Sequence, residues 1–165
     1  VNINDLDQSE FWGSYRIGRR SKTKLINYEL SKSFLKIYAS NDGYKILKGK
    51  PLHFRNIFVS EKELRIKDEV KGGSSQKAKS SVLLAPEIRI IKILKVRKHI
   101  YSILFEIPPN KKYPFPVEMK LESTVPITLE KAEFYPDFGI CLKTKKLILN
   151  LGNIPSLAEW SIIRL

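Results

Sequence analysis

Most of this sequence alternates between apolar and polar residues, and that period of two constrains the fold more than any other feature. Successive side chains of a β-strand point to opposite faces of its sheet, so such alternation predicts strands. The segments are also rich in Ile, Val, Phe, Tyr and Thr, which favour strands. No segment carries a clear helical stripe. The alternating segments are KSFLKIYAS, HFRNIFVS, ELRIKDEV, SSVLLAPEIRIIKILKV, HIYSILFEI, VEMKLES, ITLEKAEFY, FGICLKTKKLILNL and EWSIIRL.

Turn-forming residues separate these segments, in NDG, KGKP, KGGSSQ, IPPNKKYPFP, YPDFG and LGNIP. Short strands at a regular spacing of roughly ten residues are typical of antiparallel sandwiches and barrels. We therefore predict an all-β fold, an antiparallel β-sandwich of two packed sheets with about ten to twelve strands. The Gly-rich stretch KGGSSQKAKSS lacks the strand-to-helix context of a phosphate-binding loop, so we predict a hairpin loop there.

A chain of 165 residues is long enough for one domain with a substantial core and short for two. We predict a single domain over 1–165, with residues 1–10 flexible because they are polar and acidic. No apolar run reaches the length of a membrane span, so no membrane partner is expected. The single cysteine, Cys141, excludes an internal disulfide and lies in an alternating segment, which predicts a buried and inert thiol. Both periplasm and cytoplasm remain open.

The charge balance is strongly basic, with 30 Lys and Arg against 17 Asp and Glu and a net charge of +13. Such an excess attracts polyanions, namely nucleic acid, acidic polysaccharide or an anionic membrane, although it also serves solubility alone. Basic residues are dense between Arg16 and Arg55, and aromatic residues are interleaved with them. Strand alternation favours Phe34 and Phe54 pointing into the core. For Tyr44, beside a turn, a core position and a ligand-stacking position are equally open.

Few residues are candidates for metal or nucleophilic chemistry. The histidines are His53 and His99, and His53 and Asp68 lie on successive predicted strands, where they could meet across a sheet. A stable zinc site needs three or four protein ligands, and no third ligand is evident, so we predict neither a metal nor another cofactor. No nucleophile elbow or phosphate loop occurs.

General acid–base chemistry remains open. Cleavage of a uronic-acid polymer by β-elimination needs a group that neutralises the carboxylate, a base that takes the adjacent proton, and an acid that protonates the leaving oxygen. Tyr44, His53 and Arg55 are suitable residue types, and they lie close together in the sequence.

An ordered set of motifs resembles a known family. WGSYRIGRR (12–20), ASNDGYKIL (39–47), LHFRNIFVSEKELRIKDEVKG (52–72), LLAPEI (83–88) and FYPDFG (134–139) are similar, in that order, to the C-terminal β-sandwich domain of heparinase II/III-like proteins. The resemblance implies that the chain is the C-terminal part of a longer polysaccharide lyase. An N-terminal α/α toroid would be its partner, and an acidic polysaccharide, either uronate-containing or sulfated, its ligand.

The resemblance also assigns residues. It implies that His53 is the histidine that this domain contributes to the cleft, and that Asn41 takes the place of a histidine common in the family. The candidate catalytic residues are therefore His53, Tyr44 and Asn41, with Tyr44 expected to stack on or hydrogen-bond a sugar. Arg16, Arg19, Arg20 and Arg55 are the expected substrate-binding residues, because a guanidinium binds carboxylate or sulfate in a planar fork.

Two departures from the family pattern keep alternatives open. Leu83 and Ala85 stand where the family often has two further histidines, and the toroid is absent from this sequence. The isolated chain is therefore expected to be inactive, and a non-catalytic glycan-binding or scaffold module is the alternative. A nucleic-acid-binding domain is less favoured, because no recognition motif accompanies the charge.

Overall fold

The computed structural model describes residues 1–13, 16–97, 100–110 and 114–165, so His99 lies outside the described residues. The described residues form strands and no helix, and hence no helix that could cross a membrane. The strands are β1 (Asn2–Ile3), β2 (Thr23–Leu30), β3 (Phe34–Asn41), β4 (Leu52–Ser60), β5 (Glu63–Lys71), β6 (Lys77–Leu83), β7 (Arg89–Arg97), β8 (Ile100–Ile107), β9 (Val117–Ser123), β10 (Ile127–Asp137), β11 (Ile140–Asn153) and β12 (Ser156–Arg164).

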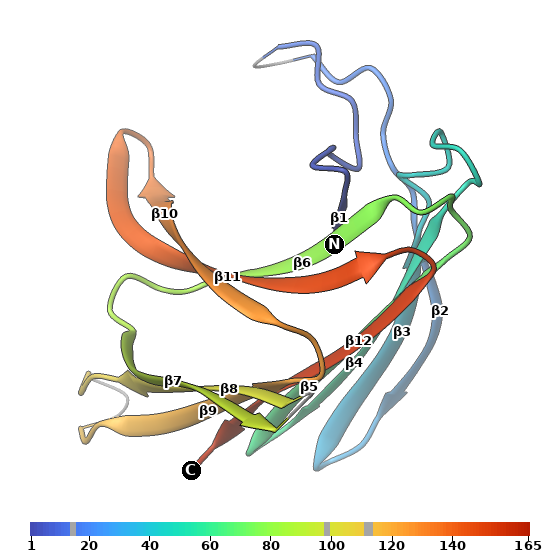
Figure 1. Ribbon diagram of the computed structural model, residues 1–165. Coiled ribbons are helices and arrows are strands. Elements are labelled where there is room, and N and C mark those ends of the chain that lie inside the picture. Colours follow the sequence, from blue (N-terminus) through green and yellow to red (C-terminus); the bar gives the residue numbers. More distant parts are fainter. Residues whose placement is uncertain (14–15, 98–99, 111–113) are drawn as a thin grey trace. The chain divides into compact units, whose positions relative to one another are not determined.

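These strands belong to two antiparallel sheets (Figure 1). One sheet has four strands in the order β1-β6-β11-β10, and the other has eight in the order β2-β3-β4-β5-β12-β9-β8-β7. The prediction of an all-β antiparallel sandwich is confirmed. The terminal segment EWSIIRL forms the end of β12 as far as Arg164, as its alternation indicates.

The described residues divide into two compact units. Unit 1 comprises Val1–Ser80 with Leu151–Glu159, and unit 2 comprises Ser81–Asn150 with Trp160–Leu165. Each unit has buried apolar side chains of its own. Those of unit 1 are Ile3, Tyr44, Ile66, Val70, Ala78, Leu151, Ile154 and Ala158, and those of unit 2 are Leu84, Ile103, Phe105, Leu121, Leu147, Ile148, Leu149 and Trp160. A single domain over 1–165 stays a prediction.

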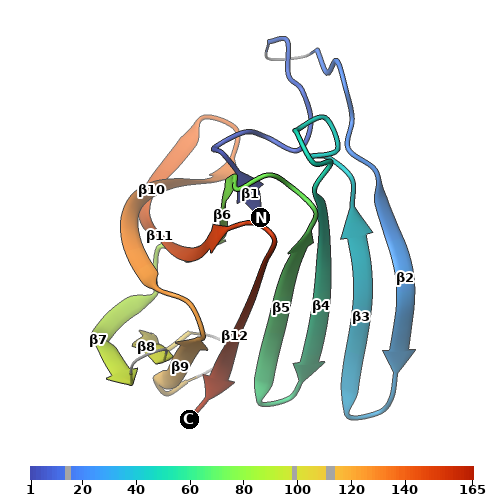
Figure 2. The same ribbon diagram turned by 45° about the vertical axis from the view of Figure 1, so that its right-hand side comes forward.

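In unit 1, strands β2 to β5 lie side by side and pair in consecutive order (Figure 2). Strand β5 shows how the sequence pattern places its side chains. Ile66, Asp68 and Val70 are buried, whereas the residues between them, such as Lys67 and Glu69, are only partly covered. The period of two therefore gives this part of the sheet one enclosed face and one open face.

The loops at one end of unit 1 approach each other closely. Gly49 has a φ of +79°, and a Cβ atom there would lie 2.5 Å from the carbonyl atoms of Gly73. The amide of Gly73 donates to the carbonyl of Gly49 at 2.9 Å. Only glycine accommodates both the positive φ and this approach, which explains the glycine in the KGKP turn.

Three sequence predictions are wrong. The stretch KGGSSQ is no hairpin loop, because β5 and β6 belong to different sheets. Cys141 lies in β11 but is exposed, since the neighbouring residues of the outer β10–β11 hairpin are exposed too. Phe34 and Phe54 are half-buried on the open face, where Lys36 and Lys71 lie 4.5 and 5.0 Å above their respective ring centres.

Residues 1–10 include β1, which pairs with β6 and buries Ile3 completely. Their flexibility stays a prediction.

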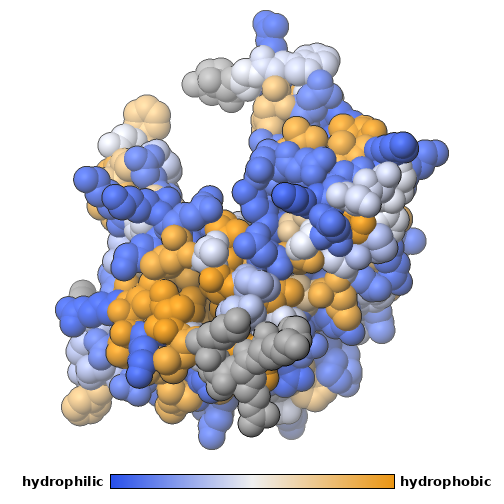
Figure 3. All heavy atoms as spheres, in the orientation of Figure 1, coloured by the Kyte–Doolittle hydropathy of each residue, from blue (hydrophilic) through white to orange (hydrophobic). Residues whose placement is uncertain are grey.

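In unit 2, hydrophobic side chains gather on the face shown in Figure 3, over the region that Figure 1 labels β7 and β8. Ile91, Ile93 and Leu94 of β7 are all exposed.

Candidate functional site

The enclosed face of unit 1 brings together several of the residues that the sequence singles out. His53 and Arg55 are two positions apart on β4 and so share a face. Asn41 of β3 pairs with His53, and Asp68 of β5 pairs with Arg55. The prediction that His53 and Asp68 meet across the sheet is confirmed, because Nε2 of His53 lies 2.8 Å from Oδ1 of Asp68.

Asp68 is the centre of this cluster and is completely buried. Arg55 donates from Nε to Oδ1 at 2.7 Å and from Nη2 to Oδ2 at 3.0 Å. The Ser80 hydroxyl donates to Oδ2 at 3.0 Å. The carboxylate therefore accepts four hydrogen bonds, counting that of His53, and this is how a buried charge is tolerated.

The surroundings shift both titratable groups. Burial by itself would raise the pKa of Asp68, but the hydrogen bonds from His53 and Arg55 and the positive charge of Arg55 outweigh it, so the pKa lies well below the usual range. Burial lowers the pKa of His53, and the hydrogen bond to Asp68 offsets only part of that effect. At neutral pH the cluster consequently holds an ionised carboxylate and a neutral imidazole.

This protonation state fixes the tautomer of His53. An ionised Asp68 can only accept, so the imidazole carries its proton on Nε2. Nδ1 then has the free lone pair, and it makes no hydrogen bond to any residue that the structure describes. The ring is held like the base of a hydrolytic triad, with the carboxylate orienting it, but it is only 6% exposed.

The cluster borders a hollow of about 360 Å³. Thr23, Asn41, His53 and Arg55 are among the residues that line it. Arg55 keeps 31% of its side chain exposed although Nε and Nη2 are bound to Asp68. Its guanidinium is thus fixed in orientation and still presents donors to the hollow.

Asn41 is engaged in a turn. Its Oδ1 accepts from the amide of Gly43 at 2.8 Å, which is the local bond expected of the Asn-Asp-Gly sequence. Its Nδ2 donates to the hydroxyls of Ser21 and Thr23 at 3.3 and 3.0 Å. Asn41 therefore joins the end of β3 to the N-terminal loop while it lines the hollow.

Tyr44 lies in the core. It is 2% exposed, and its hydroxyl lies 3.1 Å from the carbonyl of Val1 and 3.0 Å from that of Leu6. Burial raises the pKa of Tyr44 to about 12, so the phenol stays protonated and donates. Of the two interpretations open from the sequence, the structure places Tyr44 in the core, with no ring face offered to a ligand.

Arg16, Arg19 and Arg20 lie in residues 16–22, which lead into β2 (Figure 2). Arg16 and Arg20 are exposed, and Arg19 is half-buried with an Nε that has no partner among the described residues. Backbone bonds from Glu10 to Arg19 and from Trp12 to Arg16 hold this segment. None of the three arginines lines the hollow, so the structure does not bring them together with Arg55.

Sequence reasoning missed Ser80. It is completely buried, lies on β6 and contacts both Asp68 and Nη2 of Arg55. No local pattern marks it, because β6 belongs to the other sheet and only the fold brings it to the cluster. Among the described residues, no group of three or more His, Cys, Asp or Glu is arranged to hold a metal ion.

Comparison with known proteins gives two kinds of match. The family model of the heparinase II/III-like C-terminal region matches residues 1–140. Among solved structures, a heparinase III gene product matches with a TM-score of 0.66 and 15% identity, covering 87% of this chain and 22% of its own. Heparan sulfate lyase HepC from Pedobacter heparinus matches with a TM-score of 0.63 and 12% identity, covering 87% of this chain and 21% of its own.

No curated protein matches this chain. The structural matches are too distant in sequence to establish more than the fold, and the chain spans about a fifth of their length. The family model, in contrast, covers most of the chain, in agreement with the order of the sequence motifs. The chain therefore belongs to the heparinase II/III-like family and corresponds to its C-terminal region.

Proposed function

We propose that this chain is part of a polysaccharide lyase and forms one wall of an acidic-polysaccharide cleft, paired with an N-terminal α/α toroid of the same polypeptide. The observation that carries the proposal is Arg55, whose guanidinium is fixed on buried Asp68 and borders an open hollow. The family assignment and the fold shared with a heparan sulfate lyase support the same ligand class.

The proposed division of labour follows from the chemistry of β-elimination. Arg55 neutralises the carboxylate of a uronic acid, which makes the adjacent C–H more acidic. His53 is a neutral imidazole with a free Nδ1 lone pair and is the candidate base. Asp68 orients His53 and Arg55. Arg16, Arg19 and Arg20 are proposed contacts to further acidic groups along the polymer.

The alternative, a non-catalytic glycan-binding module, rests on a different observation. Tyr44 is buried in the core, and both ends of the Asn41 amide are already hydrogen-bonded. Among the described residues that line the hollow, His53 then has the one side chain able to move a proton near neutral pH. We therefore expect the 165-residue chain alone to bind acidic glycans without cleaving them.

The test compares binding and cleavage. Heparin, heparan sulfate and alginate oligosaccharides are titrated at low salt into the purified chain and into the Arg55→Lys variant, which keeps the charge but loses the planar fork. We expect the affinity of the variant to fall about tenfold, as for the loss of one charge-assisted hydrogen bond. Arg89→Lys in unit 2, where the side chain is 73% exposed, is the matched control.

Cleavage is measured as the ultraviolet absorbance of the unsaturated product, with the chain alone and with its N-terminal region restored. Cleavage only by the longer protein, abolished by His53→Gln, is the expected result. If neither form binds any acidic glycan, the proposal is wrong. A parallel titration with single-stranded and duplex nucleic acid tests the remaining alternative, because phosphate contacts give a steep dependence on salt.

A further inference from the structure

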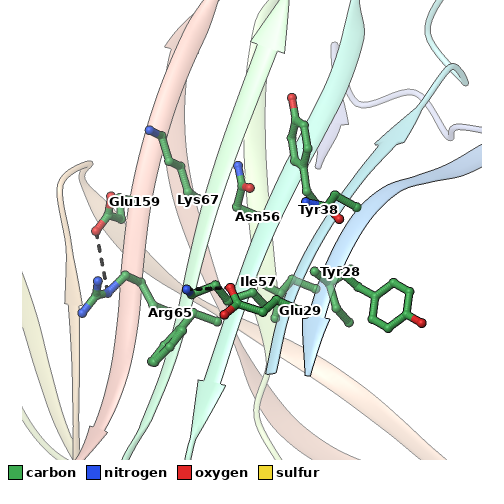
Figure 4. Close-up of a pocket in the computed structure, with 12 residues that line it drawn as sticks. Tyr28, Glu29, Tyr38, Asn56, Ile57, Arg65, Lys67 and Glu159 are labelled. Carbon is green, nitrogen blue, oxygen red and sulfur yellow. Dashed lines mark hydrogen bonds and ion pairs between the residues drawn. The ribbon is translucent and has the colours of Figure 1, made fainter. Parts of the chain in front are cut away.

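The open face of unit 1 carries a second hollow, of about 540 Å³ (Figure 4). Strand alternation places its residue Asn56 on the side of the sheet opposite to His53 and Arg55. We call this hollow the outer groove. Strand pairing arranges its side chains in two rows that cross β2, β3, β4 and β5. The first row is Asn27, Tyr38, Asn56 and Lys67, and the second is Glu29, Lys36, Phe58 and Arg65.

The charged side chains of the second row all have partners, either within the row or next to it. Lys36 and Glu29 form an ion pair at 2.9 Å, and Arg65 contacts Glu63 at 2.8 Å and Glu159 at 3.9 Å. The guanidinium of Arg65 also lies 5.7 Å from the ring centre of Phe58. These groups compensate one another's charge. The second row therefore borders the groove but leaves no charged group that needs a ligand as its partner.

The first row is not satisfied in this way. In Figure 4, Asn56 lies between Tyr38 and Lys67. Within the described part of the chain, the side chains of Asn27, Asn56 and Lys67 make no hydrogen bond or ion pair. Two amides and one ammonium group thus stand in line over three strand spacings, about 14 Å in all. The row offers both donors and acceptors and ends in the ammonium group of Lys67, which forms no ion pair with a described residue although Glu159 lines the same groove.

Aromatic rings give the groove an apolar border beside this row. Tyr38 stacks on Phe54 with ring centres 6.0 Å apart and an interplanar angle of 26°. Phe58 stacks in the same way on Phe34 at 5.9 Å and 28°. Flat rings beside amide groups suit a ligand with apolar C–H surfaces and many hydroxyl groups. The rings pack against the C–H surfaces, and the amides form hydrogen bonds with the hydroxyl groups.

We propose that the outer groove binds an acidic oligosaccharide, as a site separate from the one that Arg55 borders. Asn27 and Asn56 exchange hydrogen bonds with sugar hydroxyls, Tyr38 packs against a sugar ring, and Lys67 binds a carboxylate or sulfate. An added β-strand does not fit, because the groove runs across strands whose backbone groups are already paired.

The test is a titration of the 165-residue chain with a heparin-derived octasaccharide, followed by nuclear magnetic resonance. The side-chain amide signals of Asn27 and Asn56 report on the outer groove, and the ring signals of His53 report on the other face. We expect the amide signals to shift on binding. A neutral gluco-oligosaccharide of equal length should bind at least about tenfold more weakly, because it cannot engage Lys67.

Two variants and one control make the result decisive. Asn56→Asp keeps the size of the side chain but places a negative charge beside Lys67, and Lys67→Ala removes the cation. Each should weaken binding at the outer groove about tenfold and leave the His53 signals responsive. The control is Lys62→Ala, which removes an equal charge from the exposed β4–β5 turn and should bind like the unaltered chain.

The proposal is overturned if the amide signals of Asn27 and Asn56 do not move, or if Lys62→Ala weakens binding as much as Lys67→Ala does. The second result would mean attraction by net charge alone. The two faces of the sheet are monitored by different nuclear magnetic resonance signals. If the ring signals of His53 do not respond while the amide signals of Asn27 and Asn56 do, the proposed function is contradicted but binding at the outer groove is not.

Discussion

The replacement Asp68→Asn tests whether the buried cluster holds unit 1 together. The side chain keeps its size and loses its charge. The four hydrogen bonds to Asp68 are between 2.7 and 3.0 Å long, and three of them come from Arg55 and His53. An asparagine oxygen can accept two of the four. The amide nitrogen of the asparagine takes the place of Oδ2 and so faces Nη2 of Arg55 and the hydroxyl of Ser80. The hydroxyl can rotate and accept a hydrogen bond from this nitrogen, whereas the guanidinium can only donate.

The magnitude follows from this count. One charge-assisted hydrogen bond is lost, and two others become weaker bonds to a neutral acceptor. A single charge-assisted hydrogen bond contributes roughly 1.5–3 kcal/mol to stability. Arg55 is partly exposed, so water recovers some of the loss. We expect the free energy of unfolding to fall by about 3 kcal/mol, which lies in the range for breaking a buried ion pair. With a urea dependence near 2 kcal/mol per molar, the midpoint moves down by about 1.5 M.

The assay is urea unfolding followed by far-ultraviolet circular dichroism. Tryptophan fluorescence, measured in a Trp12→Phe background because exposed Trp12 belongs to unit 1, leaves Trp160 as a separate probe of unit 2. The matched control is Glu69→Gln, the same chemical change on the next residue, whose exposed ion pair with Lys71 contributes at most about 1 kcal/mol. If Asp68→Asn and Glu69→Gln shift the midpoint equally, the buried cluster does not stabilise the fold and the reasoning is refuted.

Two further predictions concern the same unit. The free energy of unfolding should fall as the pH drops below about 6.5, because unfolded His53 takes up a proton that the folded state resists, and fall again below about 3.8, where unfolded Asp68 does the same. The difference between the unaltered chain and His53→Gln, measured by urea unfolding across this range, isolates the first step, and a constant difference would contradict it. Tyr44→Phe should cost about 1 kcal/mol, because one buried hydroxyl proton is shared between two carbonyls that then lose their donor. Thermal unfolding checks this, with the exposed Tyr28→Phe as a control that should change nothing.

Most of the strands could be read from the sequence because their evidence is local. Alternation indicates which residues share a face, and β5 behaves as it indicates. The side-chain contact of His53 with Asp68 also followed, since successive strands joined by a short turn lie side by side in an antiparallel sheet. The phase of alternation in β3 and β4 was harder. Aromatic residues favour the core on average, yet Phe54 falls on the open face, because its neighbours His53 and Arg55 face the enclosed side. Phe34 falls on the same face because the register of β3 with β4 places it opposite Ser60.

The sequence predicted most of the strands, but not β1 or β2, and it predicted the family and the meeting of His53 with Asp68. The further contacts of these residues depend on the tertiary structure. Ser80 contacts Asp68 from a strand of the other sheet. The hydroxyl of Tyr44 donates to backbone carbonyls some forty residues away in the sequence, and the outer groove forms only where four strands pair in register. Period two reports the face of a residue within its own strand, whereas such contacts depend on how distant strands pair and pack, which no local pattern encodes.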